Sequence, residues 1–299
     1  MIYTLTLNPA LDYLVTTPNL SLGTVNRALS HDIRFGGKGI NVSVVLKNLG
    51  VSSVAMGFLA GSTGQAMRRG LKNIGLRTDF IDLQNGFTRI NIKIKNDQPM
   101  EIHGPPPEVT SKEIEELIKR LALICPGDTM VFGGNVPDSV SSDIYTRIME
   151  TLSPRQVLLA VDAQGKTLAN ALPFKPILVR LDGYSQNAQN ENNILDQAIA
   201  ARDKGAQNVI CALSAHEVIL AAFDRSLLKA QCPVSDQWAK PGVNDSMMAG
   251  FLAGLNRGLD SADCLKLATA SAAAASELDS LATRSKIESL LAETIVTEV

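Results

Sequence analysis

A single carboxylate, Asp245, lies between a glycine-containing turn and an apolar run in KPGVNDSMMAGF, residues 240–251. The apolar run has a helical pattern, so Asp245 stands where a helix begins. An aspartate there can cap the helix by accepting hydrogen bonds from unpaired backbone NH groups, and it suits the positive end of the helix dipole. It can also act as a general base beside NH groups that cradle an anion. The turn by itself leaves both interpretations open.

A second glycine-containing turn, GGKGIN at residues 36–41, also precedes a helical pattern. Gly36 and Gly37 let a ligand approach the backbone, Lys38 adds a positive charge, and the helix start adds NH donors. The stretch matches neither the GxxxxGK[ST] phosphate loop nor the GxGxxG dinucleotide motif. It indicates an anionic or polyhydroxylated ligand, with a plain glycine turn as the alternative.

Three further charged residues are candidates for binding such a ligand. Asp12 follows an apolar run and the turn LNPALD, where open α/β sheets bind ligands, and its carboxylate can accept two hydrogen bonds from sugar hydroxyls. Arg27 and Arg89 lie in or beside segments of strand-like alternation, and guanidinium groups bind phosphate bidentately. The alternative for each is an ordinary turn or surface residue. The three histidines show no metal-ligand spacing, which leaves a metal site unassigned.

The hydrophobic pattern predicts the elements that must position these residues. Short runs rich in Val, Ile and Leu alternate with helical stretches along the 299 residues, which predicts a mostly parallel sheet covered by helices. Residues 12–34 and 87–104 alternate between apolar and polar instead, as strands of hairpins do. We expect one compact domain, residues 1–299, in which these two segments form a small β lid. If one apolar face of the lid is exposed, a homodimer formed through the lid would cover it.

The composition favours a small-molecule ligand. The chain has 28 basic and 30 acidic residues, a formal charge of −2, so no broad field attracts nucleic acid or a membrane surface. The four cysteines are far apart and form no CxxC pair, as expected for thiols in a reducing compartment. No apolar run approaches the roughly 18 residues of a membrane span, and the first residues lack a basic leader segment. We expect a cytoplasmic protein.

The order of the motifs resembles a known family. NPALD near the start, GGKGINVS at 36–43, TRINIK at 88–93, GPPPE at 104–108, DSMMAGF at 245–251 and LATR at 281–284 are similar to the PfkB, ribokinase-like sugar kinases. The likeness runs through essentially the whole chain. It implies a three-layer α/β/α core with a mostly parallel sheet and a small β lid, and transfer of the γ-phosphoryl group of ATP, with Mg²⁺, to a sugar phosphate.

Within that family, the chain most resembles the kinases that convert fructose 1-phosphate to fructose 1,6-bisphosphate, followed by the tagatose-6-phosphate kinases. The resemblance implies that Asp245 is the general base and that a turn holds the transferring phosphoryl group. It also implies a sugar site and two arginines that hold the substrate's own phosphate. These groups are Gly242, Val243 and Asn244 for the turn, Asp12, Gly37, Lys38 and Asn41 for the sugar, and Arg27 and Arg89 for the phosphate.

The nucleotide side departs from the family's pattern. The turn reads GVND where the family usually has GAGD, and a β-branched valine there predicts crowding of the NH groups. Arg180, Asp182 and Ser185 take the places of the lysine, asparagine and glutamate associated with magnesium and nucleotide phosphates. In the family's Ser-x-Gly-x-x-Gly turn, the two glycines become Ser214 and Glu217, and a carboxylate there would repel a triphosphate. We assign Arg180, Asp182 and Ser214 to a degenerate nucleotide site. The alternative to an active kinase is a catalytically impaired sugar-phosphate-binding protein with weak ATP use.

Overall fold

The computed structural model describes residues 1–18, 20–181, 191–213, 217–233, 240–278 and 280–299, and of residues 191 and 192 it describes the backbone alone. Asp182, Ser185 and Ser214 therefore lie outside the described residues. Within these ranges no helix is both long and apolar enough to cross a membrane.

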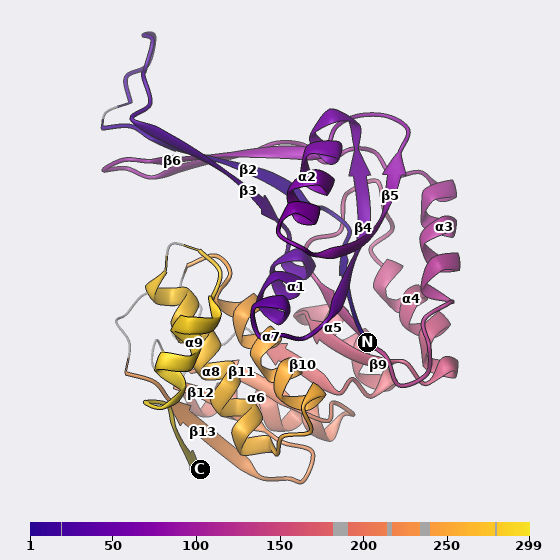
Figure 1. Cartoon of the computed structure of the whole chain (residues 1–299). Coiled ribbons are helices and arrows are strands. Elements are labelled where there is room, and N and C mark those ends of the chain that lie inside the picture. Colours follow the sequence, from indigo (N-terminus) through magenta and orange to yellow (C-terminus); the bar gives the residue numbers. More distant parts are fainter. Residues whose placement is uncertain (19, 182–190, 214–216, 234–239, 279) are drawn as a thin grey trace.

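A large central sheet organises the chain (Figure 1). In the described part it has ten strands in the order β14-β13-β12-β11-β10-β9-β8-β1-β4-β5. Neighbours from β5 to β11 are parallel, and β12 to β14 form an antiparallel edge. The strands are β1 (Ile2–Thr6), β4 (Ser53–Ala60), β5 (Arg77–Leu83), β8 (Thr129–Gly133), β9 (Leu158–Asp162), β10 (Leu178–Leu181), β11 (Val209–Ala212), β12 (Glu217–Ala221), β13 (Leu227–Gln231) and β14 (Ile295–Glu298).

Helices cover both faces of this sheet because most of its strands are apolar on both sides, so each face must be buried. The side chains of Ile2, Val131 and Ala160 belong to one core with α1 (Lys38–Asn48), α7 (Val243–Asn256), α8 (Ser261–Glu277) and α9 (Arg284–Leu291). On the opposite face, Leu5 and Phe132 pack with α3 (Ser111–Leu121), α4 (Ile144–Leu152) and the end of α5 (Gly165–Ala171). Two smaller cores hold α2 (Gly61–Asn73) and α6 (Glu191–Asp203). Short 3-10 turns occupy Ser153–Arg155 and Leu172–Phe174. The expected three-layer α/β/α architecture is confirmed.

The alanine-rich stretch in α8 allows close packing against α7, the helix that carries Asp245. A β-carbon added at Gly250 would lie 2.6 Å from Oγ of Ser271, and one added at Gly254 would lie 2.7 Å from Sγ of Cys264. Small residues on both helices are therefore needed for the two backbones to approach this closely. The packing fixes α7, and with it the start of the helix, against the core.

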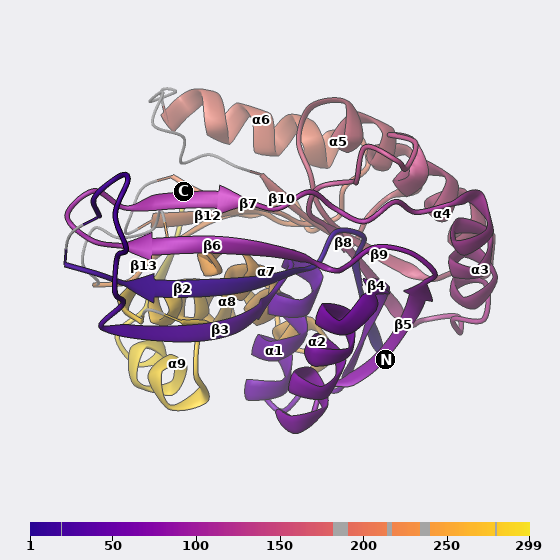
Figure 2. The ribbon, with the colours of Figure 1, turned by 90° about the horizontal axis from the view of Figure 1, so that it is seen from above.

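A separate four-stranded sheet stands off the core and extends over α7 and α8 (Figures 1 and 2). We call it the lid sheet. Its order is β3-β2-β6-β7, with β2 (Ala10–Thr16), β3 (Ser30–Gly36), β6 (Arg89–Lys95) and β7 (Met100–His103), and β2 pairs with β6 in parallel. One face is apolar, and five of its side chains are between 37% and 52% exposed: Ile33, Ile90, Ile92, Met100 and Ile102. The opposite face carries the charged and polar side chains.

Candidate active site

The start of α7 forms the centre of the candidate site. Gly242 precedes the helix with a left-handed φ of 89°, a conformation that favours glycine. Val243 is buried in the apolar core, so the branch that was expected to crowd the turn packs inward. The first NH groups of a helix have no acceptor within it, and those of Gly242, Val243 and Asn244 are the ones predicted to hold a phosphoryl group. The NH of Val243 donates a long hydrogen bond, 3.4 Å, to the carbonyl oxygen of Lys240, which an anion would have to displace. The helix start adds the positive end of the helix dipole.

Asp245 is buried at this helix start, with 6% of its surface exposed. Burial raises the pKa of its carboxyl group from 3.8 to about 6, because removal from water disfavours the charged form. The nearby Asp162 raises the pKa further, while a hydrogen bond from Asn41 and the charges of Lys38 and Arg180 oppose the rise. Asn41 donates from Nδ2 to Oδ2 of Asp245 over 2.7 Å. The carboxylate is thus mostly ionised at pH 7, yet near enough to its pKa to exchange a proton.

The contacts of Asp245 differ from those of a helix cap. The N-cap position of α7 is Gly242, which has no capping side chain. Among the described residues, the Asp245 carboxylate accepts its hydrogen bond from the side chain of Asn41 in α1, not from a backbone NH of its own turn. A carboxylate held from another helix is oriented toward the space between them, where it can accept a proton from a ligand.

The glycine-containing turn at residues 36–41 becomes the start of α1. Gly37 has a φ of 137°, and a β-carbon there would collide with the methyl group of Thr6 at the end of β1. The Thr6 hydroxyl accepts the NH of Ile40 at 3.1 Å, which holds the first turn on the sheet. Because Asn41 bonds Asp245, the starts of α1 and α7 lie together. Gly37, Lys38, Asn41 and Asp245, predicted as parts of one site, are brought together.

An ion-pair network lies near Asp245, with Asp162 and Arg180 buried and Lys38 partly exposed. Asp162, the last residue of β9, accepts hydrogen bonds from Nζ of Lys38 at 2.8 Å and from Nε of Arg180 at 2.8 Å, with a second contact from the Arg180 guanidinium. Arg180 lies opposite Asp162 on the neighbouring strand β10 and is 2% exposed. Its charge is directed at Asp162. The sequence analysis missed Asp162, although a carboxylate ending the apolar run QVLLAVDA is the signal that marks this edge of the sheet.

The lid sheet holds the second part of the predicted sugar site. Asp12 on β2 accepts a hydrogen bond at Oδ1 from Nδ2 of Asn91 at 2.8 Å, and its Oδ2 lies 3.0 Å from Nζ of Lys93. Arg89, two residues before Asn91 on β6, has a buried Nε that finds no hydrogen-bond partner among the described residues. Burial lowers the pKa of the Arg89 guanidinium, and the Asp12 charge opposes that effect. Asn91 and Lys93 were not predicted, although they occupy alternate positions in TRINIK.

Two expectations differ from what the structure places together. Arg27 is an exposed residue of the loop between β2 and β3. That loop extends beyond the lid sheet, away from the core (Figure 1). Glu217, expected to repel a triphosphate, begins β12 and is engaged across the hairpin with β13. Its Oε1 lies 3.0 Å from Nζ of Lys229 and accepts a hydrogen bond from Nε2 of Gln231 at 2.6 Å. The negative charge at this position is therefore largely compensated.

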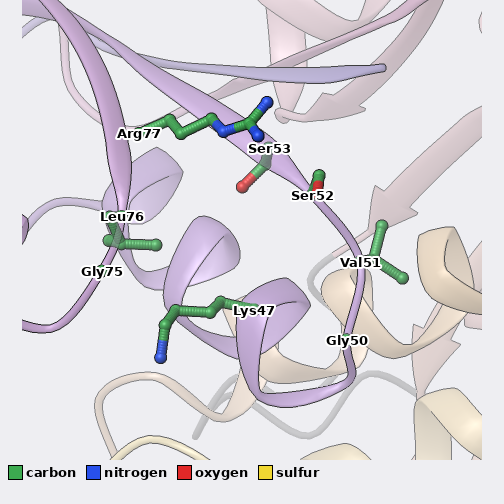
Figure 3. A pocket seen from close by; sticks show the side chains of 8 residues that line it. All are labelled: Lys47, Gly50, Val51, Ser52, Ser53, Gly75, Leu76 and Arg77. Atoms are coloured by element: carbon green, nitrogen blue, oxygen red, sulfur yellow. The ribbon is translucent and has the colours of Figure 1, made fainter.

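A cavity of about 220 Å³ lies elsewhere, at the opposite edge of the central sheet (Figure 3). Ser53 and Arg77, which begin β4 and β5, help to line it, whereas the candidate site lies where the parallel strands end. Lys47 also lines it and belongs to the last turn of α1, where a cation suits the negative end of the helix dipole. The helix end accounts for Lys47, whereas the other cation, Arg77, belongs to β5.

The geometry and the fold together define a class of protein. Two helix starts and the buried Asp245 carboxylate lie at the carboxyl edge of a parallel sheet, beside paired cations and the lid sheet, an arrangement suited to phosphoryl transfer. The chain belongs to the pfkB family carbohydrate kinases, whose model matches residues 6–286. It is therefore an ATP-dependent phosphotransferase acting on carbohydrate.

Individual relatives span the whole chain. The 1-phosphofructokinase of Bacillus subtilis (strain 168) is 31% identical over 306 residues, covering 100% of both chains. The D-tagatose-1-phosphate kinase of Bacillus licheniformis is 28% identical, also covering 100% of both. The crystal structure of a candidate phosphofructokinase from Staphylococcus aureus superimposes with a TM-score of 0.90 at 32% identity, covering 100% of this chain and 99% of that one. The resemblance inferred from the motifs is confirmed at the level of the family.

Proposed function

We propose that this protein transfers the γ-phosphoryl group of ATP to fructose 1-phosphate, giving fructose 1,6-bisphosphate and ADP, with Asp245 as the general base. The observation that carries the proposal is the buried carboxylate with a pKa of about 6, held by Asn41 where two helices begin. The similarity to 1-phosphofructokinases over the whole chain supports the acceptor.

In the proposed reaction, Asp245 accepts the proton of the substrate's C6 hydroxyl. The hydroxyl oxygen forms a bond to the γ-phosphorus, and the bond from that phosphorus to its bridging oxygen breaks, so that ADP leaves with the electron pair. Backbone NH groups of Gly242, Val243 and Asn244 hold the phosphoryl oxygens, whose negative charge the helix dipole stabilises. Lys38 adds positive charge beside the base.

The sugar is proposed to lie between the core and the lid sheet. Asp12 accepts hydrogen bonds from its hydroxyls, and Gly37 and Asn41 border it from α1. Arg89, whose Nε lacks a partner, supplies a guanidinium for the substrate's own phosphate. Arg27 would join it only if the loop between β2 and β3 moved toward the site or entered the site of a second copy.

Mg²⁺ is proposed to accompany the nucleotide. No group of three acidic, histidine or cysteine side chains is placed to hold a metal in the described ranges, and both oxygens of Asp162 are engaged by cations. The residues present thus provide no dedicated metal cage. Mg²⁺ is commonly bound through substrate phosphates and water with one or two carboxylates, and it would supply charge neutralisation on the phosphates.

Two alternatives remain as outcomes of the same experiment. Similarity to a D-tagatose-1-phosphate kinase favours an isomeric ketose phosphate as acceptor, and the resemblance of the motifs gave tagatose 6-phosphate as the alternative to fructose 1-phosphate. The engagement of Asp162 by Arg180 and Lys38 favours a sugar-phosphate-binding protein with weak ATP use, because it removes a carboxylate from metal binding.

The test is ATP-dependent turnover of fructose 1-phosphate and of the two tagatose phosphates by the purified protein, with Asp245→Asn in parallel. We expect fructose 1-phosphate to have the highest kcat/KM and the variant to lose roughly 10²- to 10⁴-fold in kcat. A higher kcat/KM with a tagatose phosphate would mean that this sugar phosphate, and not fructose 1-phosphate, is the acceptor. Binding of fructose 1-phosphate without any turnover would overturn the kinase proposal in favour of the binding protein.

A homodimer formed through the lid sheet is proposed as the working form. The exposed apolar face of that sheet is larger than isolated surface residues explain, and a second copy would cover it. Light scattering of the wild type and of Ile102→Asp checks this, with Ile295→Asp, an exposed isoleucine on β14, as the control. We expect a dimer that only the first variant dissociates, and a monomeric wild type would refute it. We further propose that the protein acts in the cytoplasm.

A further inference from the structure

Lys93 lies on the polar face of the lid sheet, in line with residues already assigned to the substrate. Successive side chains of a strand point to opposite faces, so Arg89, Asn91 and Lys93 of β6 share one face, and the exposed Ile90 and Ile92 share the other. Asn91 is opposite Asp12 in the register of β2 and β6, and it separates the two cations. The face thus presents two basic side chains on either side of the proposed sugar-binding carboxylate.

In this structure Lys93 pairs with Asp12, the carboxylate proposed to bind the sugar hydroxyls. Its Nζ lies 3.0 Å from Oδ2 of Asp12, while Asn91 donates to Oδ1 at 2.8 Å. Both oxygens of Asp12 are therefore engaged before any substrate is bound. The other acidic neighbour of Lys93, Glu101, is 3.9 Å away and is itself bonded to His103.

A sugar hydroxyl that donates to Oδ2 of Asp12 must compete with this ammonium group. The Lys93 side chain is 21% exposed, and ion pairs that solvent reaches in this way are weak. A lysine ammonium is also a mobile point charge on a flexible four-carbon stem. Displaced from Asp12, it has only the more distant Glu101 as an acidic neighbour among the described residues, and a phosphorylated sugar brings a dianion to the same face.

We propose that Lys93 determines specificity for phosphorylated over unphosphorylated sugars. When the sugar hydroxyls bind Asp12, the Lys93 ammonium group leaves that carboxylate and pairs with the phosphate of the substrate instead. This inference rests on the proposed function and extends it to a residue that has no role in the chemistry at Asp245. Arg89 approaches the phosphate from the other side of Asn91. The pair with Asp12 keeps the ammonium in place, and keeps the carboxylate from being left uncompensated, while the site is empty.

The test compares two acceptors. kcat/KM is measured for fructose 1-phosphate and for fructose with radiolabelled ATP, at enzyme concentrations high enough to count slow turnover. The variants are Lys93→Met, Lys93→Arg as the conservative replacement, and Lys95→Met as a control of the same charge two positions along the same strand face. Affinity for fructose 1-phosphate is measured in parallel by calorimetry.

We expect Lys93→Met to weaken binding and raise KM for fructose 1-phosphate roughly 10- to 100-fold, the range for a lost charge-assisted hydrogen bond, with kcat nearly unchanged. Turnover of fructose should stay within about threefold of the wild type, whereas Lys93→Arg should recover most of the affinity and Lys95→Met should change neither. An equal loss for both acceptors would mean that Lys93 only orients Asp12, and no loss for either would mean that it does not contact the phosphate. Either result overturns the proposal. If the wild type binds fructose 1-phosphate without turning it over, the proposed function fails, and the calorimetric comparison still tests Lys93.

Discussion

Replacing Asp245 by asparagine should stabilise the protein while removing its activity. A carboxyl group whose pKa rises from 3.8 to about 6 on folding costs about 3 kcal/mol of folding free energy at neutral pH, at ~1.4 kcal/mol for each tenfold change in acidity. The amide of the variant carries no charge to desolvate, and its oxygen can still accept the bond from Asn41. For a chain of 299 residues this corresponds to a rise in Tm of roughly 5 °C.

The size of this gain should depend on pH in a defined direction. Between about pH 4 and pH 6 the folded protein binds more protons at Asp245 than the unfolded chain does, because the folded pKa is the higher one. The stability of the wild type therefore falls as pH rises through this window, and that of the variant has no such contribution. The two proteins should have nearly equal Tm near pH 4, and the full difference should be present above pH 7.

Thermal unfolding of both proteins by circular dichroism from pH 4 to pH 8 checks the argument. Other ionisable groups are common to the two proteins, so the difference in Tm isolates Asp245. A variant no more stable than the wild type at pH 8, or a difference that does not shrink toward pH 4, would refute the account of a buried, destabilised base. The same pKa, which belongs to the ligand-free protein, predicts that kcat/KM of the wild type falls about tenfold per pH unit below about pH 6.

Three other substitutions test neighbouring parts of the site. Asp162→Asn should lower the free energy of unfolding by about 3 to 5 kcal/mol, since it removes the carboxylate charge paired with the buried Arg180 guanidinium. Urea unfolding at wild-type stability would contradict this. Gly37→Ala should destabilise by about 1 to 3 kcal/mol, because of its positive φ and the tight contact with the end of β1; a change below 0.5 kcal/mol in the same assay would be unexpected. Glu217→Gln should leave KM for ATP within about twofold, because Lys229 already compensates the charge; a large fall in KM would show that the carboxylate does repel the nucleotide.

The layer architecture could be predicted because buried parallel strands are apolar along their whole length. Runs such as QVLLAVDA and PILVRL became β9 and β10, and the alternating segments became the lid sheet. The antiparallel edge formed by β12, β13 and β14 was not predicted. Pairing in that edge joins segments up to some 70 residues apart in the chain, such as Leu228 with Glu298, and no local pattern announces it.

Residues of the candidate site could be predicted where their role depends on the local backbone conformation. They were harder to predict where their role depends on contacts with residues far away in the sequence. Asp245 and Gly37 are marked by the turns that begin their helices. Asp162 is 124 residues from Lys38 along the chain, and nothing in either segment indicates that they pair. Glu217 is a second case in which the partner decides. Its charge alone predicts repulsion of a triphosphate, but the hairpin brings Lys229 beside it, which the sequence does not indicate.

The junction between the lid sheet and α1 has a consequence for how the kinase avoids transferring phosphate to water. Strand β3 ends at Gly36 and α1 begins at Lys38, so Gly37 alone separates the lid sheet, proposed to contact the sugar, from the helix start proposed to lie near the phosphoryl group. Asn41, one helical turn further on, holds the base. A rotation of the lid sheet about Gly37 would therefore shift the start of α1, and with it Asn41 and the Asp245 carboxylate that Asn41 holds. Occupancy of the sugar site and alignment of the base would then be a single mechanical event, which would leave an ATP molecule bound without a sugar facing an incompletely aligned base.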